Sequence, residues 1–305
     1  MSVSIIIPTK DRGDVFRKTF EAACMSIEGI QAEIIVINDS KTSSLNIIDS
    51  DIVKVINNPK SGVASARNLG AKNSKYDCLL FLDDDIIINK ENLVTALNFI
   101  SLNKNCVLNL NWTYPPELME RIKSSSFGRF LFVYGFTSLR GWHRDLYWDD
   151  ENIFNSELAA SYFLMIKKAD FDKISGYNEA FPHAGAEDFD FAKRILKHNI
   201  QSVINPKSTV YHNEADRIDL EKWLDRKRRS AETRNVAVKL GYEEMNLVTT
   251  KSKKAIVLFM YNFRKIILGL LKLIPNNKYF DFIYFRLVNN LMAMYLYKGF
   301  FNSNK

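Results

Sequence analysis

The sequence predicts an α/β protein, in which a sheet of parallel strands is covered by helices on both faces, with a helical appendage at the carboxyl end. Two observations carry this prediction. Short apolar runs alternate with stretches of helical periodicity over the first hundred residues, and the carboxyl-terminal part pairs apolar stripes with almost exclusively positive charge. At 305 residues the chain exceeds the ~250–300 at which one core stops growing, so we expect one large domain with an appendage, or two domains.

The amino-terminal part alternates expected strands with expected helices. The strands are expected at residues 3–7, 33–37, 52–56 and 78–82, and the helices at 14–26, 63–72 and 91–102. Strands that are apolar throughout and separated by helices are typical of a sheet buried on both faces. In such sheets ligands bind at the carboxyl ends of the strands, and three of these strands end in polar clusters that contain acids. We therefore expect the clusters to converge on one crevice.

The middle of the chain is less regular. From 111 to 156 the periodicity fails, which leaves open a partly mobile loop region over the crevice or a rigid, irregular segment that packs its aromatic side chains. Beyond it we expect a strand at 157–168, a short helix at 169–174, an amphipathic helix at 187–198 and a long charged helix at 215–240. The basic run Arg226-Lys227-Arg228-Arg229 in the last helix is interpreted as a solvated face rather than a nucleic-acid contact.

Composition and cysteine content exclude several classes of protein. Hydrophobic residues make up 47% and charged residues 25%, and Gly and Pro are too few for a collagen-like or generally disordered chain. Three widely spaced cysteines, Cys24, Cys78 and Cys106, exclude a disulfide scaffold and a four-cysteine zinc site and favour a reducing compartment. We expect no secretory signal, and no transmembrane helix, because no stretch reaches ~18 uninterrupted apolar residues.

The tail, residues 251–305, concentrates the positive charge. It carries ten Lys or Arg against one acid, Asp281, so its net charge is +9, and the remaining 250 residues carry −2 of the total of +7. Two amphipathic helices are expected on either side of Pro275-Asn276-Asn277. This combination indicates contact with an anionic membrane surface, and the nearly neutral body argues against a nucleic-acid partner. The alternative is a helical pair docked on the body or on a second subunit.

The strongest chemical signal is the acidic triplet Asp83-Asp84-Asp85, which follows an apolar strand. Adjacent carboxylates repel one another, and without compensation the pKa of at least one of them rises. A divalent cation removes that penalty, and oxygen ligands suit Mg²⁺ or Mn²⁺. An ion held by one or two carboxylates keeps coordination positions for phosphate oxygens. The alternative is a solvated acidic turn.

Two further segments point to a nucleotide. Asp39 ends the second strand and can accept hydrogen bonds from a base N–H or a ribose hydroxyl, although Asn-Asp-Ser is also an ordinary turn. Residues 61–70 combine small side chains with a helix start, which favours anions, and Arg67 among them can pair with the acidic triplet or with a phosphate. The segment is neither a Walker phosphate loop nor a Rossmann glycine fingerprint.

Two later segments supply candidate catalytic and metal-binding groups. Glu187 and Asp188 follow Gly185 at a helix start, where the helix dipole favours carboxylates. One of them is a candidate general base in the crevice, and simple helix-start chemistry is the alternative. His212 follows a short strand and is a candidate metal ligand, although a lone histidine is more often structural.

Taken together, these segments resemble family 2 of the nucleotide-sugar-dependent glycosyltransferases, whose GT-A fold is a nucleotide-binding α/β domain with a mixed sheet. The matching segments are SIIIPTKDR at 4–12, VINDS at 36–40, ARNLG at 66–70, FLDDD at 81–85, ISGYNE at 174–179 and GAEDFDF at 185–191. The resemblance implies a GT-A catalytic domain at 1–214, with nucleotide-sugar binding in about 1–110 and the acceptor and catalytic part in about 111–214. The remaining residues, 215–305, form a helical region that the resemblance does not cover.

The family pattern implies a role for each matched residue near the nucleotide. Pro8, Thr9 and Asp11 are expected to line the nucleotide pocket. Asp39 is expected to hold the base, commonly uracil, and Arg67 to help fix the nucleotide end.

The same pattern assigns the acidic triplet and the histidine. Asp83 and Asp84 are expected near the ribose and the diphosphate. Asp85 is the expected main ligand of Mn²⁺ or Mg²⁺, with His212 as a further contact to the metal or the diphosphate.

The reaction implied is a single in-line displacement with inversion at the anomeric carbon. Asp188 is the expected catalytic base, and Glu187 orients the acceptor or the donor sugar. The expected donor is a nucleotide-sugar, commonly a UDP-sugar. The expected acceptor is a saccharide, which the basic tail suggests is lipid-linked, in bacterial surface-polysaccharide assembly at the cytoplasmic face of the cell membrane.

Two other classes of protein remain open. One is a metal-dependent sugar nucleotidyltransferase, which normally carries a glycine-rich basic loop directly after the first strand, where this chain is poor in glycine. The other is a non-catalytic protein that binds nucleotide-sugars or saccharides. The sequence leaves self-association undecided.

Overall fold

A computed structural model describes residues 2–42, 45, 47, 49–213 and 218–302. Its contacts divide the chain into two compact units, which are described separately. The sheet unit comprises Met1–Pro115, Ser138–Ala180 and Glu187–Glu214, and the helical unit comprises Pro116–Thr137, Phe181–Ala186 and Ala215–Lys305. The assignment of catalysis to 1–214 stays a prediction.

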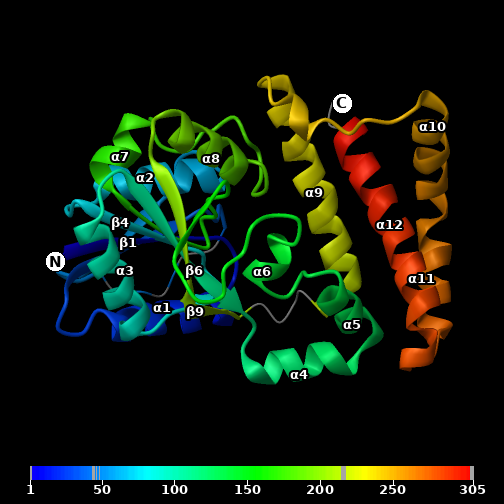
Figure 1. The fold of residues 1–305 in the computed structure, drawn as a ribbon, viewed down its shortest axis with the longest axis horizontal. Helices are drawn as coiled ribbons and strands as arrows, with labels where there is room; N and C mark the ends of the chain where they lie inside the picture. Colours follow the sequence, from blue (N-terminus) through cyan, green and yellow to red (C-terminus); the bar gives the residue numbers. More distant parts are fainter. Residues whose placement is uncertain (1, 43–44, 46, 48, 214–217, 303–305) are drawn as a thin grey trace. The chain divides into compact units, whose positions relative to one another are not determined.

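One mixed sheet forms the centre of the sheet unit (Figure 1). Its path runs β3-β2-β1-β4-β8-β6-β9-β5, with β7 paired to β9. The first four strands on this path are mutually parallel, β8 is antiparallel to both neighbours, and β6 is parallel to β9. The bounds are β1 Ser2–Thr9, β2 Gln31–Asn38, β3 Val53–Asn57, β4 Cys78–Leu82, β5 Ile86–Ile87, β6 Cys106–Thr113, β7 Phe154–Ser156, β8 Phe163–Lys167 and β9 Gln201–His212. The predicted α/β class with a mixed sheet is confirmed.

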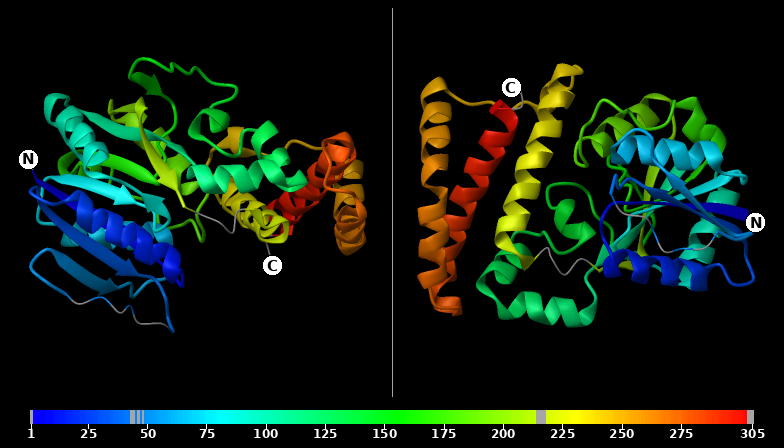
Figure 2. Two further views of the ribbon diagram at one scale, coloured as in Figure 1. Left: turned by 90° about the horizontal axis from the view of Figure 1, so that it is seen from below. Right: turned by 180° about the vertical axis from the view of Figure 1, so that it is seen from behind.

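Helices cover both faces of this sheet (Figures 1 and 2). One face carries α2 Val63–Asn73, α7 Lys168–Lys173 and α8 Glu187–Lys197, and the other carries α1 Asp14–Ser26 and α3 Lys90–Leu102. Every residue of β1 from Val3 to Thr9 is buried, as double coverage requires. Gly70 allows α2 to approach β1, because a Cβ there would lie 2.3 Å from the Ile6 side chain.

The expectation of an irregular segment at 111–156 is wrong for much of its length, although 143–153 has neither helix nor strand and packs its aromatic side chains. The segment 111–156 contains the end of β6, β7 and three short helices, α4 Pro116–Ser124, α5 Ser126–Val133 and α6 Leu139–Trp142. Helices of four to nine residues are too short to leave a readable apolar period. Serine N-caps mark the start of α5 and α6. The Ser125 side chain accepts from the Gly128 amide, and the Ser138 side chain accepts from the Gly141 amide.

The strand expected at 157–168 is also longer than the one observed. Only Phe163–Lys167 forms β8, and the residues before it turn instead. The Leu158 amide donates to the Ser156 hydroxyl at 3.0 Å, so a side chain rather than a neighbouring strand satisfies this backbone group. This turn brings Ser161 to the edge of the sheet where the acids lie.

The helical unit has its own core. Its remaining elements are α9 Leu220–Lys239, η2 Glu243–Met245, α10 Lys251–Met260, η3 Tyr261–Phe263, α11 Arg264–Leu273, η4 Lys278–Phe280 and α12 Asp281–Asn302. Trp223 and Leu224 of α9 pack with Leu291 and Met294 of α12, together with aromatic side chains of α5. The two helices expected around Pro275-Asn276-Asn277 are confirmed, the first being divided by η3.

Two further expectations concern α9 and the membrane. The helix expected at 215–240 begins at Leu220, and residues 215–217 lie outside the described residues. In the basic run, Arg228 and Arg229 form ion pairs with Asp225 at 2.8 and 3.3 Å. The solvated face expected there holds only in part, because Arg229 is exposed whereas the other three residues are half-buried, and Lys227 lies over the Phe136 and Trp223 rings. Among the described helices, none combines the length and the apolar character that crossing a bilayer requires.

Candidate functional site

The predicted residues gather where three neighbouring parallel strands end. Thr9 ends β1 and pairs in register with Asn38, which ends β2, while β4 ends at Leu82, directly before the acidic triplet. The Asp39 amide donates to the Thr9 carbonyl at 2.8 Å. Parallel strands direct their carboxyl ends to one edge of the sheet, so the polar clusters meet there. Pro8 is buried within β1 at this edge.

The acidic triplet is held by contacts from the β1–α1 loop. Asp84 accepts from the Thr9 hydroxyl at 2.7 Å and from Arg12 Nε at 3.3 Å. Arg12 Nη2 lies 2.6 Å from one carboxylate oxygen of Asp85. Burial, and then the charge of Asp85, raise the pKa of Asp84 to about 7, although Arg12 and Thr9 oppose the shift. Repulsion between the neighbouring carboxylates is thus a cause of the raised pKa of Asp84, second to burial.

Asp85 and His212 form a buried pair. His212 Nε2 lies 2.9 Å from the other carboxylate oxygen of Asp85, and both side chains are at most 5% exposed. Pairing of β5 with β9 places His212 opposite Ile86, and the Asn213 amide donates to the Asp85 carbonyl at 2.7 Å. Residues 127 positions apart in sequence are thus fixed beside each other by the sheet.

This pair fits a divalent ion as part of its ligand set. Adjacent ligands of an octahedral ion at ~2.0–2.1 Å lie ~2.9 Å apart, which is the observed separation of the two donors. The described residues include no group of three or more His, Cys, Asp or Glu placed to hold a metal. Ions of the Mg²⁺ type commonly use one or two protein groups and complete their shell with phosphate and water.

Asp39 organises the loop that begins α2. Its carboxylate accepts from the Asn58 amide group at 2.6 Å and from the Gly62 backbone amide at 3.0 Å, and Lys10 Nζ lies 3.6 Å away. Gly62 has φ +128°, a conformation that side chains rarely adopt. Asp11 has φ +52° and accepts from the Ser40 hydroxyl at 2.7 Å, which joins the ends of β1 and β2.

Arg67 joins the triplet to the later acids. Its side chain is 2% exposed and contacts Asp83 at 2.9 Å, Glu187 at 3.2 Å and Asp188 at 3.9 Å. Burial alone lowers its pKa, but the three carboxylates together raise that pKa above its ordinary value. The guanidinium also lies over the Tyr177 ring, 5.1 Å from its centre. Arg67 is therefore a charged side chain whose ion pairs connect α2 with the end of β4 and the start of α8.

Asp188 has the properties of a proton acceptor near neutral pH. One carboxylate oxygen accepts from both the backbone amide and the hydroxyl of Ser161 at 3.1 Å, and the side chain is 27% exposed. Burial, and then Glu187, raise its pKa to about 7, while Arg67 and the Ser161 amide lower it. A base whose pKa lies near the working pH is suited to proton transfer.

The contacts thus join the predicted residues along one edge. The series runs from Asp39 to Lys10, through Thr9 and Arg12 of the same loop to the triplet, and then through Arg67 to Asp188. Sequence reasoning assigned no role to three residues that contact the predicted ones: Arg12, Asn58 and Ser161. Arg12 had a readable signal, because adjacent carboxylates after an apolar strand favour a nearby cation, and Asp84 and Asp85 are indeed buried. Ser161 had none, since it lay inside an expected strand.

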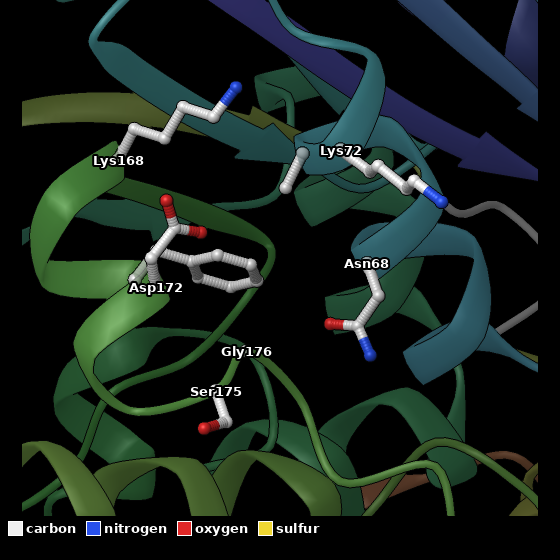
Figure 3. Close-up of a pocket in the computed structure, with 8 residues that line it drawn as sticks. Asn68, Lys72, Lys168, Asp172, Ser175 and Gly176 are labelled. Carbon is white, nitrogen blue, oxygen red and sulfur yellow. The ribbon is translucent and has the colours of Figure 1, made fainter.

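A separate groove of about 450 Å³ lies between α2 and α7 (Figure 3). Its lining includes Asn68, Lys72, Lys168 and Asp172, and none of the predicted site residues. Lys168 Nζ donates to the Ser74 carbonyl at 2.8 Å, and Asn68 bonds the Tyr177 backbone. These polar groups serve the packing of the helices, so the groove is not part of the site described above.

The sheet unit is an α/β fold with a mixed sheet and with acids at the carboxyl ends of parallel strands. Residues 4–175, more than half of the chain, match the family described as Glycosyl transferase family 2, and residues 154–216 match the N-terminal domain of galactosyltransferase. The chain belongs to glycosyl transferase family 2. This confirms the family that the motifs indicated.

The chain is also similar to a curated relative, and it shares its fold with solved structures. An uncharacterized glycosyltransferase of Haemophilus influenzae is 27% identical over 64% of this chain and 62% of its own length. The mannosyltransferase PcManGT from Pyrobaculum calidifontis, in complex with GDP-Man and Mn²⁺, has a TM-score of 0.56 at 10% identity, covering 98% of this chain and 87% of that one. GalNAc-T7 with UDP, GalNAc and Mn²⁺ has a TM-score of 0.53 at 17% identity over 69% of this chain and 43% of that one. The chain thus spans less than two thirds of the length of the Haemophilus relative and of GalNAc-T7.

Proposed function

We propose that this protein transfers a sugar from a nucleotide-sugar to a hydroxyl of a saccharide, with inversion at the anomeric carbon. The observation that carries the proposal is the single edge at which Asp85, His212 and Asp188 are joined through Arg67 and the triplet. Diphosphate-binding and proton-accepting groups are thus near enough to act on one substrate. Membership of glycosyl transferase family 2 supports the reaction class.

The donor is bound by the ends of β1 and β2 and by the start of α2. Asp39 accepts hydrogen bonds from the base, next to Thr9 and Asp11. UDP is the proposed nucleotide. Both UDP and GDP-mannose occur in solved structures of this fold, so we test the two bases side by side.

Asp85 and His212 are the proposed protein ligands of Mn²⁺ or Mg²⁺. When bound, such an ion offsets the negative charge that develops on the leaving nucleoside diphosphate. Asp83 and Asp84 lie beside the ribose and the diphosphate in this proposal. Arg67, which is already paired to Asp83, fixes that end of the site.

Asp188 is the proposed general base. It removes the proton from the attacking acceptor hydroxyl, while the two hydrogen bonds from Ser161 hold its carboxylate in position. Glu187 is 2% exposed and forms an ion pair with Arg67. Because it does not face solvent, its proposed role is to hold Arg67 and the neighbouring Asp188 in position. It positions the sugar-binding side of the edge.

A donor panel tests the proposed function directly. We expect Mn²⁺-dependent release of a nucleoside diphosphate from one UDP-sugar, and none after Asp85→Asn. Lys72→Gln, in the separate groove, serves as a control that keeps full activity. Release of pyrophosphate would instead identify the nucleotidyltransferase alternative. Binding without turnover across a panel of donors and saccharide acceptors would favour the non-catalytic alternative.

Asp39→Ala is expected to weaken UDP binding at least about tenfold, because it removes acceptors for the base and also releases the Asn58 and Gly62 donors that shape the loop. Calorimetric titration with UDP and with uridine measures this. Asp49→Ala is the matched control, since Asp49 accepts from the Val55 amide at the far side of β3. Equal losses of affinity in the two variants would contradict the assignment.

The tail supports a lipid-linked acceptor at an anionic membrane surface. Six apolar side chains, each 46–79% exposed, follow one another at alternating spacings of three and four along α10, η3 and α11: Ile256, Phe259, Phe263, Ile266, Leu270 and Leu273. The opposite side of α11 is used for packing, because Leu268 and Leu271 are buried in the core of the helical unit. The exposed stripe is therefore additional to the docking of the helical pair.

Charge selects the partner of this exposed stripe. Lys251, Lys253, Lys265, Lys272 and Lys278 are exposed around it, within a tail of net charge +9. Such charge repels a second copy of the same stripe and attracts anionic lipid headgroups, at about 1 kcal/mol per Lys or Arg near the surface. We propose that the stripe lies in the interface of the cytoplasmic leaflet and keeps the enzyme beside a lipid-linked saccharide.

Vesicle flotation with point variants tests this surface without deleting α12, which belongs to the core. We expect the triple variant Phe259→Ser, Phe263→Ser, Ile266→Ser to lose about 100-fold in partitioning onto vesicles of equal phosphatidylglycerol and phosphatidylcholine. The matched control replaces three other exposed apolar residues, Met25, Ile52 and Leu102, by Ser. Equal flotation of the two variants would contradict the proposal. So would a dimer of the native protein that dissociates in the stripe variant.

A further inference from the structure

We propose that Arg12 makes metal binding at Asp85 depend on the nucleoside diphosphate. Its guanidinium contacts the carboxylates of Asp84 and Asp85, so the protein itself places a positive charge beside the metal site. This inference rests on the proposed function, since it concerns the ion proposed for Asp85 and His212. Its basis is the contact of a single guanidinium with two neighbouring buried carboxylates, Asp84 at 3.3 Å and Asp85 at 2.6 Å. Arg12 is therefore a positioning residue, and it selects for a metal ion that arrives together with the diphosphate.

The backbone is built to hold Arg12 over the acids. Asp11 and Gly13, on either side of it, have φ +52° and +48°, so the loop reverses direction at this point. The Arg12 carbonyl accepts from the Val15 amide at 3.1 Å, which ties the loop to the start of α1. Asp11 adopts this left-handed conformation although it has a Cβ.

The two oxygens of Asp85 have different partners. One faces Arg12 Nη2, and the other faces His212 Nε2. An arginine stays protonated throughout the accessible pH range, so the guanidinium charge is permanent. A divalent ion that binds the His212 side of Asp85 therefore meets a fixed positive charge on the same carboxylate, and the repulsion weakens its binding.

A diphosphate changes this balance. It brings negative charge to an edge that then holds a divalent ion and a guanidinium, and both cations are satisfied by phosphate oxygens. Each ligand therefore raises the affinity for the other, and the two effects are equal by thermodynamic linkage. The consequence is selection: metal without nucleotide is rejected, and the complete pair is accepted.

Lys10 provides the matched control for this effect. It lies two residues before Arg12 on the same loop, but its ammonium faces Asp39 at 3.6 Å and Ser61 rather than the acidic triplet. Lys10→Gln removes the same unit of charge from the same loop. A general effect of loop charge would appear in both variants, whereas the proposed effect belongs to Arg12 alone.

The experiment measures Mn²⁺ affinity by electron paramagnetic resonance, with and without UDP, and needs no acceptor and no turnover. For Arg12→Gln we expect Mn²⁺ alone to bind at least about tenfold more tightly than in the native protein, and the tightening by UDP to fall by at least about tenfold. Lys10→Gln is expected to keep the native affinity for Mn²⁺ alone. The charge-balanced double variant Arg12→Gln, Asp84→Asn guards against loss of folding. It is expected to bind Mn²⁺ alone less tightly than Arg12→Gln, because it lacks the Asp84 carboxylate, and to show the same reduced tightening by UDP.

The outcomes separate this inference from the proposed function. If Mn²⁺ and UDP bind cooperatively and the Arg12 variants keep the native coupling, Arg12 is only a structural counter-ion and the inference is overturned, while the metal site stands. If Lys10→Gln reproduces the effect, the inference is likewise overturned. If no Mn²⁺ binds to any variant with or without UDP, both the inference and the proposed metal site fail.

Discussion

Asp188→Asn is expected to reduce kcat for sugar transfer by about 10²–10⁴-fold while leaving the affinity for the nucleotide-sugar within about twofold. The carboxamide keeps an oxygen that can accept from Ser161, but it cannot take a proton from the acceptor hydroxyl. Steady-state kinetics and donor titration measure the two quantities separately. Asp172→Asn, on the exposed side of α7, is the control and is expected to leave both unchanged.

The pH dependence of kcat/KM and of Tm provides a second test of the role of Asp188. Because burial and Glu187 raise its pKa to about 7, kcat/KM is expected to rise with pH through about 7 and then to level. A carboxyl group whose pKa is raised in the folded state contributes stability below its unfolded pKa of about 3.9, and this is lost as pH rises through 7. The Tm advantage of Asp188→Asn should therefore grow from pH 5 to pH 8. A variant with near-native turnover would remove Asp188 from the base role.

Arg67→Met is expected to destabilise the fold by about 3–5 kcal/mol at pH 8, which lowers Tm by about 5–8 °C. The substitution leaves Glu187 without its buried cation, and Asp83 and Asp188 lose the same partner. The loss should shrink toward pH 5, because unpaired carboxyl groups take up protons. Thermal unfolding followed by circular dichroism at the two pH values measures the difference.

Two comparisons show whether the cost of Arg67→Met comes from buried charge. Arg17→Met makes the same change in an exposed arginine of α1 that pairs with Asp14 and Glu21, and Tm is expected to stay unchanged. Arg67→Met combined with Glu187→Gln is expected to recover part of the lost stability, because the most buried of the three carboxylates is then neutral. No recovery in the double variant would point to packing rather than charge as the cause.

Local pattern was sufficient for much of the fold. The runs at 3–7, 33–37 and 78–82 could be assigned as strands because they are apolar on both faces, and α1 could be bounded at Asp14 and Ser26 from its periodicity. The segment 111–156 could not, because helices as short as four residues depend on caps and on tertiary packing rather than on a repeated period. The strand β6 escaped notice for a related reason, since Asn109 and Asn111 interrupt its apolar run.

The sequence by itself determined the chemistry available to this protein: the acids, the arginine and the histidine, and the strand ends that carry most of them. Only the tertiary structure decided which groups meet. Asp85 faces His212 because β5 pairs with β9, and Asp188 reaches Arg67 because α2 and α8 cover the same face of the sheet. It also decided that the Arg12 guanidinium contacts Asp85 and that the apolar stripe of α10 and α11 is exposed. The physical reason is that residue type and local period are carried by neighbours along the chain, whereas contact, burial and pKa arise from segments that are distant in sequence.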